Sequence, residues 1–377
     1  MKFIQAVLIL SGMIIGVGMF AIPFSFTTVG FWLGVAELVV VAGAITVVHV
    51  CYGEVALATR EFHRLPGYVR LHLGSKAAFF AYGSALFGIG GTLFAYILLG
   101  GVFLESTVRY SLGISVPLPV LTAAFVAAGA FITVLPSNNK VMANGILTLL
   151  LVGFILMLAA VLMPHVSSEN FKGFSPRNFL APYGVLMFAF SGAAVIPDLI
   201  GFMDRERVGS RRAIVVGSLI PLVVYLLFTA AVIGASGERV SPDAIMGLLP
   251  FIGPSAVGWG SAIGFLAVFT SFIVLTSSFQ AFFQYDLGAG KKISLALGVV
   301  LPLIFLFAGV TDYIAVIAAV GALSFGLDAA MIFVMYYVVR SRSDAAPRRH
   351  PALLFTLVLI SCMIVVGMGY EIYMLWG

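Results

Sequence analysis

The sequence Ser11-Gly12-Met13-Ile14-Ile15-Gly16-Val17-Gly18-Met19-Phe20-Ala21-Ile22-Pro23-Phe24 decides how the chain is interpreted. It lies within an apolar segment covering residues 3–26, which is long enough to cross a bilayer. Glycine and proline are poorly suited to a helix interior, so the stretch predicts an interruption at Gly16-Val17-Gly18. In hydrocarbon such an interruption is tolerated only where the backbone lines a cavity or is buried in protein. The alternative is that the glycines form a small-residue face for a neighbouring helix.

The composition of the chain fixes its class. Of 377 residues, 62% are hydrophobic and only 9% are charged, and the mean hydropathy is +1.15. These values exclude a soluble domain and predict a polytopic protein of the lipid bilayer. The formal net charge is +5, but the basic residues are scattered over short loops. We therefore attribute the charge to membrane topology and expect no nucleic-acid partner.

Hydrophobic length and charged interruptions predict about eleven membrane spans. The predicted spans are residues 3–26, 31–58, 77–104, 118–135, 141–163, 181–203, 213–235, 256–285, 293–310, 313–339 and 353–376. With this division, sixteen of the 20 Lys and Arg residues fall on the side of the N-terminus. The other four are Arg109, Lys172, Arg177 and Arg239. The positive-inside rule then predicts a cytoplasmic N-terminus and an extracytoplasmic C-terminus in a prokaryotic inner membrane.

A second interrupted segment predicts an internal repeat. Residues 188–198 place small residues at mid-membrane and then Pro197, as in the first span. The second segment lies in the sixth span, after an odd-numbered unit of five spans, so the two segments enter the membrane from opposite sides, as in inverted-repeat transporters. The predicted fold is all-α, with a five-plus-five inverted repeat, discontinuous first and sixth helices and an extra C-terminal helix. The predicted units are 1–163 (first repeat), 164–180 (extracellular loop), 181–340 (second repeat) and 341–377 (cytoplasmic loop and eleventh helix).

Residues 12–18 with Pro23 resemble the first-helix signature of the amino acid–polyamine–organocation superfamily, which shares the fold of the bacterial leucine transporter. The second-helix end Tyr52-Gly53-Glu54, the loop 63–68 and the segment 190–192 with 197–198 are similar to the aromatic amino acid permease branch, within the amino acid–auxin permeases. Relatives commonly carry a glutamate where this chain has Asp198.

The resemblance implies how an amino acid would be held. Its carboxylate would meet N–H groups near Gly16 and Gly18, and its ammonium would meet carbonyls at both breaks. Side-chain selectivity would come from spans three, six and eight, although Tyr96 is equally explained as a packing or interfacial residue. The implied substrate-binding residues are Met13, Ile14, Gly16, Val17, Gly18, Gly91, Tyr96, Phe190, Ser191, Gly192 and Ala193.

The resemblance also implies a site for a coupling ion. Sodium-coupled members hold the cation between first-helix carbonyls and an Ala-x-x-Thr/Ser-Thr/Ser motif of the eighth helix. The implied sodium-binding residues are Gly12, Ile15, Ala267, Thr270 and Ser271. Alternatively, the two hydroxyl groups bond back to their own helix. Proton-coupled relatives often place a fifth-helix lysine in that space, whereas Lys140 lies only at the end of the fifth span, which favours Na+.

Acidic residues within the spans support the alternative of proton coupling, because charges at such depth are costly and usually functional. Asp328 and Glu37 are the candidate proton carriers, and the same groups are alternatively structural. Asp198 follows the sixth-helix break closely enough to bond to unwound backbone.

These features predict a sodium-coupled importer of a small neutral amino acid, aromatic or branched, that works by alternating access. Small residues at Gly192, Ala193 and Ala194 are expected to leave space for a bulky side chain. No enzyme motif and no ATP-binding Gly-x-x-x-x-Gly-Lys segment occurs, so neither enzymatic activity nor an organic cofactor is expected. A proton-coupled symporter, an amino acid sensor and an ion channel on the same scaffold are the alternatives. The oligomeric state is not predicted.

Overall fold

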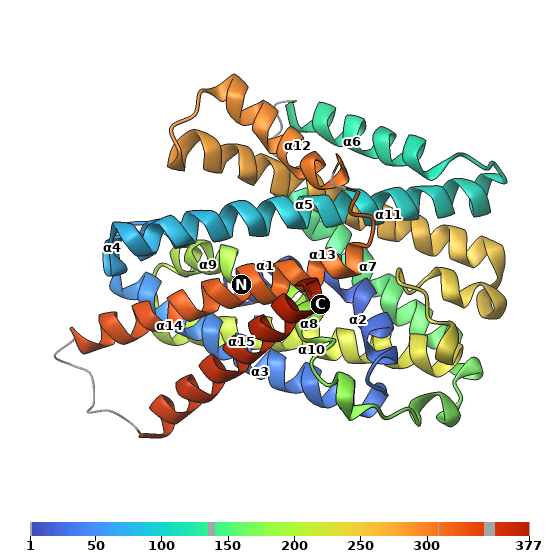
Figure 1. Ribbon diagram of the computed structural model, residues 1–377, viewed down its shortest axis with the longest axis horizontal. Helices are drawn as coiled ribbons and strands as arrows, with labels where there is room; N and C mark the ends of the chain where they lie inside the picture. The colour runs from blue at the N-terminus through green and yellow to red at the C-terminus, as the bar shows by residue number, and fades with distance from the viewer. Residues whose placement is uncertain (1, 135–139, 308, 343–350, 377) are drawn as a thin grey trace.

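The structure is a computed structural model that describes residues 2–134, 140–307, 309–342 and 351–376. Side chains are described in these ranges except at 134, 140–148, 285–286, 305–307, 351–354 and 376. All regular elements in the described ranges are helical, and no strand occurs among them (Figure 1). The predicted all-α class is therefore confirmed.

The chain alternates long helices with short turns. The first group of α-helices is α1 (Lys2–Ile14), α2 (Gly18–Thr27), α3 (Phe31–Ala58), α4 (Leu65–Leu73), α5 (Ser75–Leu112), α6 (Leu118–Val134) and α7 (Lys140–Leu162). The second group is α8 (Tyr183–Ala189), α9 (Ile196–Phe202), α10 (Arg207–Ser236), α11 (Leu249–Ala281), α12 (Lys291–Phe307), α13 (Tyr313–Ala319), α14 (Gly326–Ser341) and α15 (Pro351–Trp376). The π-helical turn η8 (Val320–Phe325) joins α13 to α14.

Every predicted span contains a helix, but not every helix has full membrane length. Among the described residues, seven helical segments are long and apolar enough to cross a bilayer, and the bent pair α1–α2 makes an eighth. α6 and the described apolar part of α7 are shorter, and α12 has 17 residues. The total of eleven crossings and the inverted repeat thus stay predictions.

Two local features differ from the sequence prediction. The loop after α3 contains the helix α4, which is too short to be recognised by span length and buries Pro66, Tyr68 and Val69. The next helix, α5, extends beyond the predicted span at both ends and has 38 residues. It stops at Gly113, whose φ of 70° lies in the left-handed region that favours glycine.

The long helices form two neighbouring groups with the short interrupted helices between them. α5 lies along α11, and α6 and α12 lie beside these two (Figure 1). α10 packs against α1 and α3, and α3 also packs against α14. The short helix α8 crosses α13 closely, because a Cβ atom on Gly184 would lie 2.4 Å from the Ala318 carbonyl oxygen. This packing fixes where the two interrupted segments meet.

Candidate substrate-binding site

The first helix is interrupted where the sequence predicts. α1 ends at Ile14, α2 begins at Gly18, and the two helices are bent by 54°. The last bond before the break joins the Ile15 N–H to the Ser11 carbonyl at 2.8 Å. Within the described residues, the N–H groups of Gly16, Val17 and Gly18 donate to no main-chain carbonyl. The end of α1 therefore presents carbonyl groups and the start of α2 presents N–H groups, which favour a cation and an anion respectively.

The sixth span is interrupted as well. α8 ends at Ala189, residues 190–192 are not helical, and a 3-10 turn (Ala193–Val195) leads into α9. The Ser191 N–H reaches back to the Phe188 carbonyl at 3.1 Å, which tightens the end of α8. Pro197 follows in the first turn of α9, where its missing N–H costs nothing because that group has no helical partner.

The two breaks pack directly against each other. A Cβ atom on Gly18 would lie 2.7 Å from the Ala189 Cα, so glycine is required for the start of α2 to reach the end of α8. A Cβ atom on Gly192 would lie 2.6 Å from Cγ1 of Ile14. Ile14 and Leu10 thus fill the space beside Gly192. The expectation that Gly192 leaves room for a substrate side chain is therefore wrong, because α1 occupies that volume.

Tyr225 of α10 bridges the two breaks. Its side chain is fully buried, and its hydroxyl oxygen lies 2.7 Å from the Ile14 carbonyl oxygen and 2.9 Å from the Ala189 carbonyl oxygen. The ring of Phe190 meets the Tyr225 ring edge-on, with the ring centroids 5.2 Å apart. The sequence patterns described above do not single out Tyr225. One feature of the sequence could have indicated it: Tyr225 lies inside an apolar span, and a buried tyrosine hydroxyl needs a hydrogen-bond partner.

The other predicted substrate residues differ in how close they lie to the two breaks. Tyr96 of α5 is half-buried and within electrostatic range of Tyr225, so it lies near the breaks. Gly91 instead faces η8, because its Cβ would lie 2.4 Å from Cγ2 of Val320. Val17 is buried, and Met13 is 37% exposed. Within the second break, Gly192 is buried, and Ser191 and Ala193 are half-buried.

The predicted sodium ligands lie on two helices. Gly12 and Ile15 are at the carbonyl end of α1, next to the break, and Ala267, Thr270 and Ser271 are on α11. The Thr270 hydroxyl donates to the Leu266 carbonyl at 2.9 Å, as the alternative interpretation expected. This bond uses only the hydroxyl proton, so the oxygen lone pairs stay free to meet a cation. The side chain of Lys140 lies outside the described residues.

Asp328 belongs to a hydrogen-bonded cluster between α5 and the η8–α14 segment. The Ser84 hydroxyl donates to the Asp328 carboxylate at 2.7 Å, and the Ser324 hydroxyl donates to the Ser84 carbonyl at 2.8 Å. The Asp328 carboxylate therefore joins α5 to α14, and Ser324 joins α5 to the π-helical turn η8, which packs against α8.

Glu37 has a different environment from Asp328. It is 3% exposed, and neither carboxyl oxygen has a hydrogen-bond partner among the described residues. The Tyr183 hydroxyl of α8 is likewise buried without a partner, and it lies within electrostatic range of Glu37. Glu371 of α15, which sequence reasoning did not select, is also buried. An unpartnered buried carboxyl is costly unless it carries a proton or meets a ligand.

Among the described residues, the Asp198 carboxylate forms no hydrogen bond with unwound backbone, contrary to the expectation from the sequence. Its carboxylate pairs with the Arg64 guanidinium at 2.6 Å, and Arg64 also donates to the Ala194 carbonyl at 3.1 Å. Arg64 therefore supplies the link to the second break. The expected contact is wrong because Asp198 lies on α9 and points outward, at 44% exposure.

Further polar contacts join helices at the end of the molecule where Arg64 pairs with Asp198. Lys2 pairs with Asp204 at 2.5 Å, joining the start of α1 to the segment after α9. The Arg205 guanidinium donates to the carbonyls of Ala56, Leu57 and Thr59 at the end of α3. These contacts gather basic residues that the sequence assigns to the cytoplasmic side.

Comparisons with known proteins agree with this architecture. Glutamine transporter 2 of Aliivibrio fischeri is 22% identical over 237 residues, which are 62% of this chain and 61% of that protein. Tyrosine-specific transport system 1 of Haemophilus influenzae is 23% identical over 231 residues, 60% of this chain and 56% of that protein. The chain thus aligns with less than two thirds of either relative.

Two solved structures share the fold. MhsT in complex with L-phenylalanine has a TM-score of 0.71 at 16% identity, covering 99% of this chain and 97% of MhsT. Mhp1, a nucleobase-cation-symport-1 family transporter, has a TM-score of 0.67 at 14% identity, covering 98% of this chain and 92% of Mhp1. The family and relatives found are permeases and transporters rather than enzymes. The model of the tryptophan/tyrosine permease family matches residues 1–370, and the chain belongs to that family.

Proposed function

We propose that this protein imports a small neutral amino acid by alternating access, with the substrate held at the two helix breaks. The observation that carries the proposal is the convergence of both breaks on Tyr225. The N–H groups of Val17 and Gly18, which donate to no main-chain carbonyl among the described residues, suit the substrate carboxylate, while the Gly16 N–H faces the Tyr225 hydroxyl. The carbonyl groups that end α1 and α8 suit the substrate ammonium. A zwitterion matches this pair of opposite partial charges.

An aromatic or branched substrate is the class we favour. The relatives are named for glutamine and tyrosine, and the family for tryptophan and tyrosine. The buried aromatic residues Phe190 and Tyr225 beside the breaks offer ring edges and faces against which an aromatic side chain can pack.

Sodium is the coupling ion that we propose. The carbonyls of Gly12 and Ile15 at the end of α1 and the oxygen atoms of Ala267, Thr270 and Ser271 on α11 would be its ligands. A monovalent cation needs several converging oxygens but no formal charge. The alternative is a proton carried by Glu37 or Asp328, and the unpartnered carboxyl of Glu37 is the specific observation in its favour.

We further propose that the protein lies in a prokaryotic inner membrane with its N-terminus in the cytoplasm. The contacts of Lys2, Arg64, Arg205 and Arg207 gather at one end of the molecule, as the positive-inside rule requires of a cytoplasmic face. The five-helix units 1–163 and 181–340 would then be the inverted repeats, and the segment 341–377 would add the last helix.

The decisive experiment uses purified protein in liposomes, with tryptophan, tyrosine, phenylalanine, leucine and glutamine offered under imposed sodium or proton gradients. Uptake driven by a sodium gradient supports the proposal, and uptake that ignores sodium but follows protons replaces it with the proton alternative. Binding without uptake would indicate a sensor, and ion current without amino acid would indicate a channel.

Variants then locate the ion. Thr270→Ala is expected to weaken the sodium dependence of uptake. Ser278→Ala is the matched control, because Ser278 also bonds back to its own helix, donating to the Val274 carbonyl at 3.1 Å. Glu37→Gln and Asp328→Asn are expected to leave sodium-driven uptake in place. Loss of proton-driven uptake in either variant, with Thr270→Ala unchanged, would overturn the sodium assignment.

A further inference from the structure

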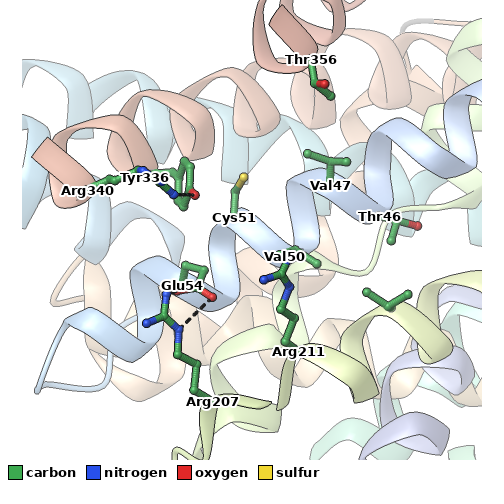
Figure 2. Close-up of a pocket in the computed structure, with 11 residues that line it drawn as sticks. Thr46, Val47, Val50, Cys51, Glu54, Arg207, Arg211, Tyr336, Arg340 and Thr356 are labelled. Atoms are coloured by element: carbon green, nitrogen blue, oxygen red, sulfur yellow. Dashed lines mark hydrogen bonds and ion pairs between the residues drawn. The ribbon is translucent and has the colours of Figure 1, made fainter. Parts of the chain in front are cut away.

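A cavity of about 430 Å³ opens at the end of the molecule where the basic residues gather. It lies between the last turns of α3, the first turns of α10, the end of α14 and the start of α15 (Figure 2). None of its lining residues belongs to the two helix breaks. The proposed transport function does not use this cavity.

The charged groups at the mouth of the cavity are mostly cationic. Arg207 pairs with Glu54 at 2.5 Å, so these two charges compensate each other. Arg340 donates to the Tyr336 hydroxyl at 2.8 Å, a neutral partner. Arg211 has no ion pair or hydrogen bond among the described residues. Two guanidinium groups, those of Arg211 and Arg340, therefore have no carboxylate partner in the described part of the chain, and both act electrostatically on Cys51 between them.

The part of the cavity lining that lies toward the middle of α3 and α10 is mostly apolar, with Thr46 as its polar member. The lining residues of α3 lie on one face of the helix, with Val47 and Val50 deeper than Glu54. On α10, Val215 follows Arg211 one turn further into the membrane. Glu206 caps the start of α10 through the N–H groups of Val208 and Gly209, which holds this turn in place. The cavity thus has a cationic mouth and an apolar wall that continues toward the middle of the bilayer.

We propose that this cavity binds an anionic phospholipid of the cytoplasmic leaflet, with the headgroup phosphate on Arg211 and Arg340 and an acyl chain along the valine wall. Guanidinium groups bind phosphate through charge-assisted hydrogen bonds, and basic pockets between helices at the cytoplasmic side suit anionic headgroups. A soluble phosphate would leave the wall of Val47, Val50 and Val215 uncovered. The apolar wall is the reason for choosing a lipid over a free anion.

The test measures lipid retention by the full-length protein. Purified protein in a neutral detergent is titrated with phosphatidylglycerol or phosphatidylcholine, and bound lipid is counted by native mass spectrometry. We expect phosphatidylglycerol to be retained in preference to phosphatidylcholine. Arg211→Gln and Arg340→Gln should each reduce phosphatidylglycerol retention about fivefold, the factor for one basic residue at an anionic surface.

Two further variants make the result decisive. Lys292→Gln removes an equal charge from an exposed position at the start of α12, away from the residues that line this cavity, and it should retain lipid like the parent protein. Arg211→Lys keeps the charge and should retain most of the lipid, which separates loss of the site from loss of the fold. Melting temperatures in detergent check the fold of each variant.

Three results would overturn the proposal. Equal losses for Arg211→Gln and Lys292→Gln would mean that lipid is held by general surface charge. Displacement of phosphatidylglycerol by excess inorganic phosphate would mean a soluble-anion site. Equal retention of phosphatidylglycerol and phosphatidylcholine would mean that Arg211 and Arg340 do not select for an anionic headgroup.

Discussion

The hydroxyl oxygen of Tyr225 lies 2.7 Å from the carbonyl oxygen of Ile14, the last residue of α1. The same hydroxyl lies 2.9 Å from the carbonyl oxygen of Ala189, the last residue of α8. A phenolic hydroxyl carries one proton, so it donates fully to only one of these acceptors at a time. The other carbonyl stays available to a second donor, and the substrate ammonium is the donor that our proposal supplies.

Tyr225→Phe should therefore weaken both the fold and the substrate site. The variant removes the one donor that these two carbonyl groups share in a buried place, which costs about 1–3 kcal/mol of unfolding free energy. We also expect a raised KM for amino acid uptake, measured in liposomes. Tyr337→Phe on α14 is the control, because Tyr337 is 51% exposed. A Tyr225→Phe variant with unchanged KM and melting temperature would contradict the bridging role.

Gly18→Ala and Gly16→Ala should differ although they are two residues apart. The new Cβ at 18 would lie 2.7 Å from the Ala189 backbone, whereas the new Cβ at 16 would meet only the Ile14 carbonyl, at 3.9 Å. Overpacking against backbone costs about 1–3 kcal/mol, so Gly18→Ala should lower the melting temperature and abolish uptake. Gly16→Ala should keep the parent melting temperature. Similar melting temperatures for the two variants would show that the breaks do not pack as described.

The Arg64–Asp198 pair should influence transport more than stability. The two side chains are 53% and 44% exposed, and exposed pairs contribute about 0–1 kcal/mol, which salt screens further. Because Arg64 also holds the Ala194 carbonyl, Arg64→Gln should change the rate of uptake while the melting temperature moves little. The charge-reversed double variant Arg64→Asp, Asp198→Arg should restore part of the rate. Additive effects in this double-mutant cycle would argue against a functional pair.

Asp243 should make stability depend on pH. It lies in the loop between α10 and α11, outside the spans, and is 3% exposed. Burial raises the pKa of its carboxyl above the ordinary value of 3.8. The folded state therefore binds the proton more tightly than the unfolded state, and this contribution to stability is lost as pH rises from 3.8 through the raised folded pKa.

Asp243→Asn should flatten that dependence, because the neutral amide has no proton to lose and still accepts from the Met246 N–H. The measurement is the melting temperature as a function of pH for the variant and the parent protein. Glu238→Gln, at an exposed position of the same connection, is the matched control and should leave the pH profile unchanged. An unaltered profile in Asp243→Asn would show that another group titrates.

The sequence by itself determined the membrane class and the positions of both interrupted helices. These features are local: a run of apolar residues must satisfy its own backbone in hydrocarbon, and glycines at 16 and 18 or a proline at 197 show where it does not. The tertiary structure alone decided which side chains meet there. Tyr225, the filling of Gly192 by Ile14 and the pairing of Asp198 with Arg64 depend on how helices distant in sequence rotate and pack. In nearly uniform apolar spans, hydrophobic periodicity does not report that rotation.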